Sequence, residues 1–285
     1  MEKIAVLADI HANLAALHAL LEDLDRWSPD RVVVAGDTVN RGPRPRECLD
    51  LVLRLAAERG WRLLRGNHER YVLSYDQERR RPDFPTSGPR HELIRGIAWT
   101  HAQLAGHVAT IAAMPESLRL DLGGATMAVY HASARHDRDG LERGAPAATL
   151  REQIDPAAEI FCAGHTHVPF ARRLGGTLVV NVGSVGLPFD GDRRAAHPRL
   201  TRGRGGWRAR IVRLAYDYTA AERDFRESGM LEAAGAHGPL MLRELQTGRS
   251  LLFDFVPAYH ERILAGAIGA DEAVREFLAR VERAA

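Results

Sequence analysis

Five short segments, far apart in the chain, are each followed closely by aspartate, asparagine or histidine. The segments have the pattern of strands, most are unbroken apolar runs, and they cover residues 4–8, 31–35, 61–65, 126–130 and 160–163. The polar side chains that follow them are Asp9, His11, Asp37, Asn67, His68, His131, His165 and His167. Unbroken apolar runs are typical of strands buried on both faces. Because ligand sites in α/β sheets lie beyond the carboxyl ends of the strands, we expect these side chains to share one site.

Helical patterns separate the first strands. After the first strand, leucines recur at positions 14, 17, 20, 21 and 24, which is the spacing of one helix face. Residues 47–59 also have a helical pattern, and further strands are expected at 178–180 and 209–215, the latter after a basic turn at 199–208. The alternation predicts an α/β fold that contains βαβ units.

Two further segments are expected to be mainly helical. Residues 71–122 form an insertion after the third strand, with a charged, proline-containing loop at 74–90 and a helix at 91–114. This insertion either caps the site or packs on the outside of the sheet; we expect it to affect substrate choice and not the chemical step. Residues 1–218 are then the main domain, and 219–285 form a helical appendage packed on it.

The histidines outside the motifs, at positions 18, 101, 107, 237 and 260, are expected at exposed or helix-surface positions.

Composition narrows the class of protein. The chain has 285 residues, 45% hydrophobic and 27% charged, as in ordinary globular proteins. An apolar run near about 18 residues is missing, so we expect neither a membrane span nor a secretory signal. Cys48 and Cys162 are the only cysteines, which favours a reducing cytoplasm. The net charge of +2 makes nucleic acid an unlikely partner, and homo-oligomerisation is left open.

The residue types at the strand ends predict a divalent metal site. Carboxylate, imidazole and amide oxygen together suit manganese, iron, zinc, cobalt or nickel. Seven of these side chains, all except His68, exceed the needs of one ion, whereas two ions that share a bridging carboxylate would use them all. Two metals can clamp a phosphorus centre during in-line displacement. We therefore expect two divalent ions, manganese first among them, with a hydroxide between them as the nucleophile.

The order of the motifs resembles a known family. The chain contains "DIHAN", "GDTVNRGP", "GNHE", the His131 segment and "GHTH" in that order, and over residues 1–215 it resembles the calcineurin-like metallophosphoesterases. The resemblance is strongest to the bacterial phosphodiesterases and dinucleoside-polyphosphate hydrolases. It implies a two-sheet β-sandwich flanked by helices, which we adopt in place of a single open sheet. It also implies that one ion is held by Asp9, His11, Asp37 and His167, and the other by Asp37, Asn67, His131 and His165.

The same resemblance implies roles for residues that bind no metal. His68 would donate a proton to the leaving oxygen or stabilise it, and Arg41 would grip the phosphate, with a surface salt bridge as its alternative role. Asn13 is expected to cap the first helix, with a substrate contact as the lesser alternative. Asn40 stands where the protein-phosphatase branch has an aspartate that orients the histidine, so the partner of His68 is left open.

These features predict a metal-dependent phosphoesterase that acts on a small phosphate ester, with phosphodiesters or small nucleotides as the first choice. The alternatives are a monoesterase similar to the protein Ser/Thr phosphatases, a dinucleoside-polyphosphate hydrolase, and a binding scaffold without catalysis. The scaffold alternative predicts missing ligands, yet every motif residue is present.

Overall fold

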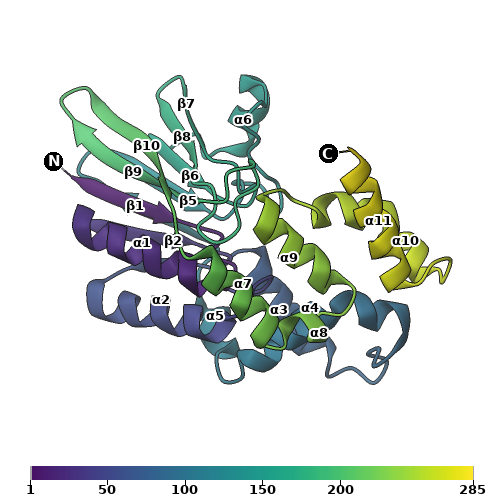
Figure 1. Ribbon diagram of the computed structural model, residues 1–285. Helices are drawn as coiled ribbons and strands as arrows, with labels where there is room; N and C mark the ends of the chain where they lie inside the picture. The colour runs from purple at the N-terminus through teal and green to yellow at the C-terminus, as the bar shows by residue number, and fades with distance from the viewer. Residues whose placement is uncertain (1, 285) are drawn as a thin grey trace.

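The computed structural model describes residues 2–284 and contains two five-stranded sheets (Figure 1). The first sheet contains β1 (Lys3–Leu7), β2 (Arg31–Ala35), β3 (Arg62–Leu64), β9 (Ala195–Gly203) and β10 (Gly206–Leu214). Its order is β10-β9-β1-β2-β3, with β1, β2 and β3 parallel. The second contains β4 (Ser117–Asp121), β5 (Thr126–Tyr130), β6 (Ile160–Ala163), β7 (Phe170–Leu174) and β8 (Thr177–Asn181). Its order is β4-β5-β6-β8-β7, with β5, β6 and β8 parallel.

The two sheets pack face to face, as alternation along β1 illustrates. Ile4 and Val6 belong to the apolar core between the sheets. Ala5 and Leu7 point to the other face and pack beneath helices. Successive side chains of a strand alternate between faces, so an unbroken apolar run requires a cover on both. The expected sandwich is confirmed.

Helices cover the outer faces of both sheets. The helices α1 (Leu14–Trp27) and α2 (Pro45–Arg59) share one core with the first sheet, and α7 (Tyr218–Glu227) lies beside α1 (Figure 1). On the second sheet, α6 (Ala147–Gln153) contributes Leu150 to a separate core.

The insertion differs in detail from its prediction. It contains α3 (Asn67–Glu78), α4 (Gly88–Gln103), α5 (Val108–Ala113) and β4. The expected loop begins as helix up to Glu78, because α3 starts within the "GNHE" motif, where the Glu69 carboxylate caps it by accepting the N–H of Gly66. The expected helix at 91–114 is interrupted around Gly106, whose φ of +90° does not continue a helix. The last part of the segment pairs with β5 as a strand of the second sheet.

The C-terminal segment is helical, as expected. It continues after α7 with α8 (Met230–Ala233), α9 (His237–Thr247), α10 (Leu252–Leu264) and α11 (Ala270–Ala284). The helices α9, α10 and α11 form their own apolar core, to which Leu93 of α4 is added, so the segment packs largely on the insertion. His237 is buried among them and stacks on His260, which corrects its expected surface position. Between residues 2 and 284, no helix has the length and apolar character needed to cross a membrane.

Candidate metal centre

The candidate site lies where the two sheets meet at the carboxyl ends of their parallel strands. Turns after β1, β2 and β3 of the first sheet and after β5 and β6 of the second supply its side chains. Three groups of side chains have potential ligand atoms within 4.8 Å of one another: Asp9, His11 and His167; His11, Asp37 and His68; and Asp37, His131 and His165. Asn67 joins them because its Oδ1 lies 2.8 Å from His131 Nε2. The seven residues expected as ligands are thus brought together.

The backbone of these turns is held in an uncommon conformation. Among residues 2–284, nine non-glycine residues have positive φ, and all except Ser28 belong to the turns of the site: Asp9, His11, Ala12, Asp37, Asn40, Arg41, His165 and His167. Such residues cost on the order of 1–3 kcal/mol each, and they are typical of functional sites whose surroundings hold them in place.

Two glycines allow the turns to approach one another closely. A Cβ on Gly66 would lie 2.2 Å from Asp37 Oδ1, and one on Gly164 would lie 2.4 Å from Asp9 Oδ2. Any larger residue would displace a carboxylate. Gly164 of the "GHTH" motif therefore has the expected role of close backbone approach.

Three histidines have a fixed tautomer. The Nδ1 atoms of His11, His131 and His167 face the backbone carbonyls of Asn40, Ala35 and Leu187. A carbonyl only accepts hydrogen bonds, so Nδ1 carries the proton in each ring. The Nε2 atoms then present lone pairs to the centre of the site. This is how metal-ligating histidines are commonly oriented.

The lone pairs face other acceptors, which indicates a cation site. His11 Nε2 lies 3.1 Å from His167 Nε2, and His131 Nε2 lies 3.1 Å from Asp37 Oδ2. Asp9 Oδ1 and Asp37 Oδ2 are buried and have no hydrogen-bond donor among residues 2–284. Buried acceptors without a donor are costly, and a metal ion would satisfy them.

The charges of the side chains in the cluster also indicate a cation site. Burial lowers the pKa of His131, but the Asp37 carboxylate outweighs it and raises this pKa to about 10. Without a metal ion, His131 Nε2 therefore takes up a proton next to Asp37, and it regains its lone pair only when another cation replaces that proton. Asp37 Oδ2 is also 3.8 Å from His11 Nε2, so the same oxygen faces both halves of the cluster. The donor set therefore suits divalent cations, and Asp37 faces both halves of it.

Asn40 is the partner of His68 that the sequence left open. The backbone N–H of Arg41 can only donate, and it meets Asn40 Oδ1 at 2.9 Å. Asn40 Nδ2 therefore faces His68 Nδ1, at 2.8 Å, and donates to it. The His68 proton must then reside on Nε2, which lies 4.0 Å from Asp37 Oδ2. Thr100 of α4 also donates to Asn40 Oδ1, so the insertion contacts the residue that orients His68.

Arg41 is buried and forms an unexpected ion pair. Its Nη2 donates to Glu244 Oε2, and Glu244 lies on α9 with no exposed surface. The guanidinium carbon lies 5.4 Å from the ring of Phe189, which stacks on His167 at 4.2 Å between ring centroids. Arg41 is therefore beside the cluster, and its ion pair is internal instead of the surface salt bridge considered as the alternative. The pairing with Glu244 spans 203 residues, and no local sequence signal indicates it.

Asn13 has the contacts of a helix cap. Its Oδ1 accepts the N–H of Ala16, and its Nδ2 donates to the carbonyl of Gly186 and the hydroxyl of Tyr216. These contacts favour capping over the substrate contact proposed as its alternative.

Glu69 supports the site although sequence reasoning gave it no role. Its carboxylate accepts the N–H groups of Asp37, Thr38 and Gly66, each at 2.8 Å. Burial, reinforced by the Asp37 charge, raises the pKa of Glu69 to about 7. The signal was available, because this glutamate stands at the capping position of the "GNHE" motif.

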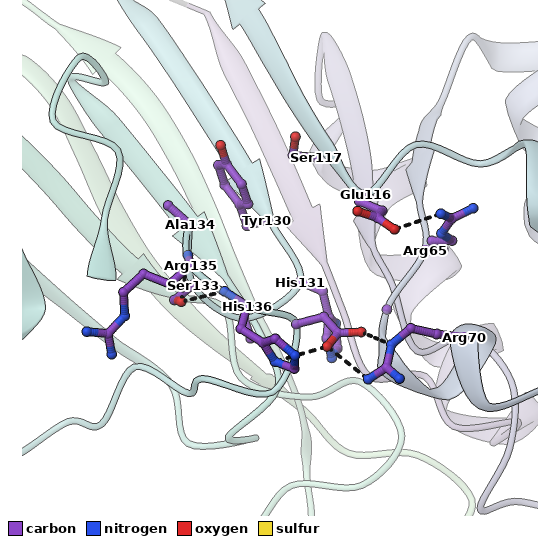
Figure 2. A pocket seen from close by; sticks show the side chains of 13 residues that line it. Arg65, Arg70, Glu116, Ser117, Tyr130, His131, Ser133, Ala134, Arg135 and His136 are labelled. Atoms are coloured by element: carbon purple, nitrogen blue, oxygen red, sulfur yellow. Dashed lines mark hydrogen bonds and ion pairs between the residues drawn. The ribbon is translucent and has the colours of Figure 1, made fainter. Parts of the chain in front are cut away.

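A cavity of about 310 Å³ adjoins the cluster at Gly66 and His131 (Figure 2). Three arginines line it, and each is already paired with a carboxylate: Arg65 with Glu116, Arg70 with Asp137 and Arg135 with Asp139. The cavity offers room beside the cluster but little unpaired positive charge.

Comparison with known proteins agrees with this geometry. Residues 2–198 match the calcineurin-like phosphoesterase superfamily domain. An uncharacterised protein of Methanocaldococcus jannaschii is 26% identical over 234 residues, which make up 76% of this chain and 89% of that protein. A metallophosphoesterase from Sphaerobacter thermophilus is 28% identical, with 87% of this chain and 99% of that chain covered and a TM-score of 0.65. A hypothetical protein of Pyrococcus horikoshii OT3, 20% identical, shares the fold with a TM-score of 0.72 over 88% of this chain and all of its own. Because the matched domain spans well over half of its length, the chain belongs to the calcineurin-like phosphoesterase superfamily.

Proposed function

We propose that this protein hydrolyses phosphate esters with the help of two divalent metal ions, and that phosphodiesters or small nucleotides are its substrates. The observation that carries the proposal is the shared Asp37 Oδ2, which is buried, lacks a donor among the described residues and faces histidines of both halves of the cluster. One ion would be held by Asp9, His11, Asp37 and His167, and the other by Asp37, Asn67, His131 and His165. Manganese is the first candidate among the metals that suit such ligands.

The protein residues orient the reaction around these ions. When bound, two divalent ions lower the pKa of a water molecule and neutralise charge on the phosphate oxygens. Asp9 and Asp37 are fixed by backbone donors, since Asp9 Oδ2 accepts the N–H of His165 and Asp37 Oδ1 accepts that of His68. Their remaining oxygens therefore cannot rotate away from the centre.

His68 would act on the leaving oxygen. Burial, together with the Arg41 charge, lowers the pKa of His68 to about 3, although the Asp37 carboxylate opposes this shift. At neutral pH the ring is thus uncharged and presents Nε2–H to the site. A donor in this position stabilises the charge that develops on a departing alkoxide.

The test is hydrolysis of bis-p-nitrophenyl phosphate by the purified chain. Protein treated with a chelator should be inactive, and Mn²⁺ should restore turnover with about two equivalents bound. Bound metal is measured by mass spectrometry of the ions after desalting. A chain that binds two ions yet hydrolyses no phosphate ester in a panel of diesters, cyclic nucleotides, dinucleoside polyphosphates and phosphopeptides would contradict the proposal and favour a scaffold.

A further inference from the structure

Glu244 is a buried carboxylate, and both of its oxygens accept hydrogen bonds. Its Oε2 accepts from Arg41, and its Oε1 accepts the N–H groups of Leu251 and Leu252, at 2.7 and 2.9 Å. These two N–H groups belong to the N-cap residue and the first residue of α10. The carboxylate is therefore fixed by the C-terminal helices and cannot swing away from Arg41 without breaking these hydrogen bonds.

Arg41 is not completely enclosed, because 10% of its side chain is exposed beside the cluster. Its Nε is buried and has no hydrogen-bond partner in the described part of the chain. The guanidinium packs over Phe189, whose opposite contact is the candidate ligand His167. The arginine thus adjoins the metal centre with an unused donor, while its charge is already matched by Glu244.

We infer that Glu244 sets the charge of the phosphate site and thereby makes it select phosphodiesters over phosphomonoesters; the inference rests on the proposed function. A monoester carries nearly two negative charges at neutral pH, whereas a diester carries one. An unpaired guanidinium would attract the second charge of a monoester. Because the Arg41–Glu244 pair is neutral overall, Arg41 can donate a hydrogen bond to a phosphate oxygen, but the pair does not attract the second negative charge of a monoester. The buried carboxylate would also repel the dianion.

A second ion pair between the same segments supplies the control. Arg44 Nη2 donates to Asp224 Oδ1 of α7 at 2.6 Å, so it also ties the turn after β2 to the C-terminal helices. This pair is partly exposed, with 32% and 20% of the two side chains accessible, whereas Glu244 has none. If a substitution merely loosens the C-terminal helices, removal of Glu244 or of Asp224 should have the same effect on ester selectivity. If the buried charge beside Arg41 is the cause, only removal of Glu244 should change that selectivity.

The experiment compares Glu244→Gln with Asp224→Asn. Glutamine keeps the shape and can still accept the N–H of Leu251, but it leaves Arg41 with an unbalanced charge. The measurement is kcat/KM for bis-p-nitrophenyl phosphate and for p-nitrophenyl phosphate with Mn²⁺ at one pH. Glu244→Gln should lower the diester-to-monoester ratio by about tenfold, chiefly through a lower KM for the monoester. Asp224→Asn should leave the ratio within about twofold of the parent.

The double variant Arg41→Met/Glu244→Gln keeps the inference testable if the single variant does not fold. It removes a neutral pair and leaves no unpaired buried charge, so overall activity should fall while the ratio stays near that of the parent. An unchanged ratio in folded Glu244→Gln, or a collapsed ratio in the double variant, would overturn the role of Glu244. Absence of hydrolysis of both esters by the parent protein would contradict the proposed function itself.

Discussion

At the scale of single residues, the position of one proton on His68 determines what this side chain can do. Asn40 donates to Nδ1, so the ring offers N–H at Nε2 and needs no positive charge to do so. An aspartate at position 40 would instead accept from Nδ1 and favour a charged ring. The chain therefore has a neutral hydrogen-bond donor where the resemblance to protein phosphatases would suggest an imidazolium acid.

His68→Ala should have an effect that depends on the leaving group. A ribose alkoxide needs stabilisation as it departs, whereas a nitrophenolate is stable as an anion. We expect a loss of about 10²-fold or more in kcat on a nucleoside phosphodiester and a much smaller loss on a nitrophenyl ester. Metal content, measured in parallel, should stay at two equivalents. Loss of one ion would mean that His68 is a ligand, as its proximity to His11 and Asp37 also permits.

Asn40→Asp should introduce a new pH dependence. The added carboxylate stabilises the charged ring, so the pKa of His68 should rise from about 3. The charged acid is present below the new pKa and is lost above it. Turnover of the nucleoside diester should therefore decline as pH rises through that value, over a range where the parent rate is flat. Ring-nitrogen NMR shifts of His68 would report the titration directly, and no change in them would refute the assignment of the tautomer.

Asp37→Asn tests the bridge. An amide shares its oxygen between two cations poorly, so at least one ion should be lost and kcat should fall by about 10²-fold or more. The exposed Asp121→Asn, at the end of β4, serves as the control for loss of a carboxylate elsewhere. If Asp37→Asn still binds two equivalents of metal and is as active as the parent, Asp37 does not bridge the ions.

At the scale of elements, strands with consecutive apolar residues were predictable, and strands in which polar residues are interspersed were not. The spans expected at 31–35, 126–130 and 160–163 match β2, β5 and β6 residue for residue, because each contains at least three consecutive buried apolar residues and lies inside a sheet. β4, β7 and all of β9 were missed, and residues 199–208, which were expected to form a turn, lie mostly within β9 and β10. β7 shows the reason, since its sequence FARRL places two arginines, one half-buried and one exposed, between buried ends at the margin of the second sheet. Polar edge strands carry little apolar signal.

Some residues of the candidate site were predictable from the sequence, and others were not. Residues that follow buried strands were predictable, because the sheet fixes where they point. Glu244 was not, since its position depends on how α9 packs and its partner is 203 residues away. Helix patterns indicate which face is apolar, but they do not indicate which distant turn that face will meet.

Docking of α1 on the first sheet gives an element-scale prediction. Asp23 of α1 bonds to His197 Nε2 at 3.0 Å and Arg199 Nη2 at 2.6 Å, both on β9. These partners hold the pKa of Asp23 at about 2, below its usual value near 4, although burial opposes the shift. Asp23→Asn should lower the free energy of unfolding by about 1–3 kcal/mol near pH 7. The deficit should be full above about pH 4 and shrink as pH falls toward 2, because the parent then loses the same charge. Urea unfolding at several pH values measures it, and a deficit independent of pH would exclude the charge as its cause.

At the scale of the whole molecule, the candidate metal centre joins the two sheets. Asp9, Asp37 and Asn67 follow strands of the first sheet, whereas His131 and His165 follow strands of the second. The shared core already holds the faces together. At the carboxyl ends, however, the contacts are mostly between acceptors, so without cations this end of the sandwich is the less favourable one.

Metal binding should therefore stabilise the entire fold and not only the turns. Ions that bind the folded state alone stabilise it by about 2.7 kcal/mol for each site at a hundredfold excess over Kd. For a chain of this size, that corresponds to a rise in Tm on the order of 5–10 °C per site. The measurement is calorimetry of chelator-treated protein with and without Mn²⁺, with Asp121→Asn as the control and Asp37→Asn as the variant that should show a reduced rise. Probes in both sheets should report one transition that shifts as a unit, because the ligands come from both. If Mn²⁺ binds but the probes report separate unfolding transitions, or only one sheet is stabilised, the ions do not link the two sheets of the sandwich.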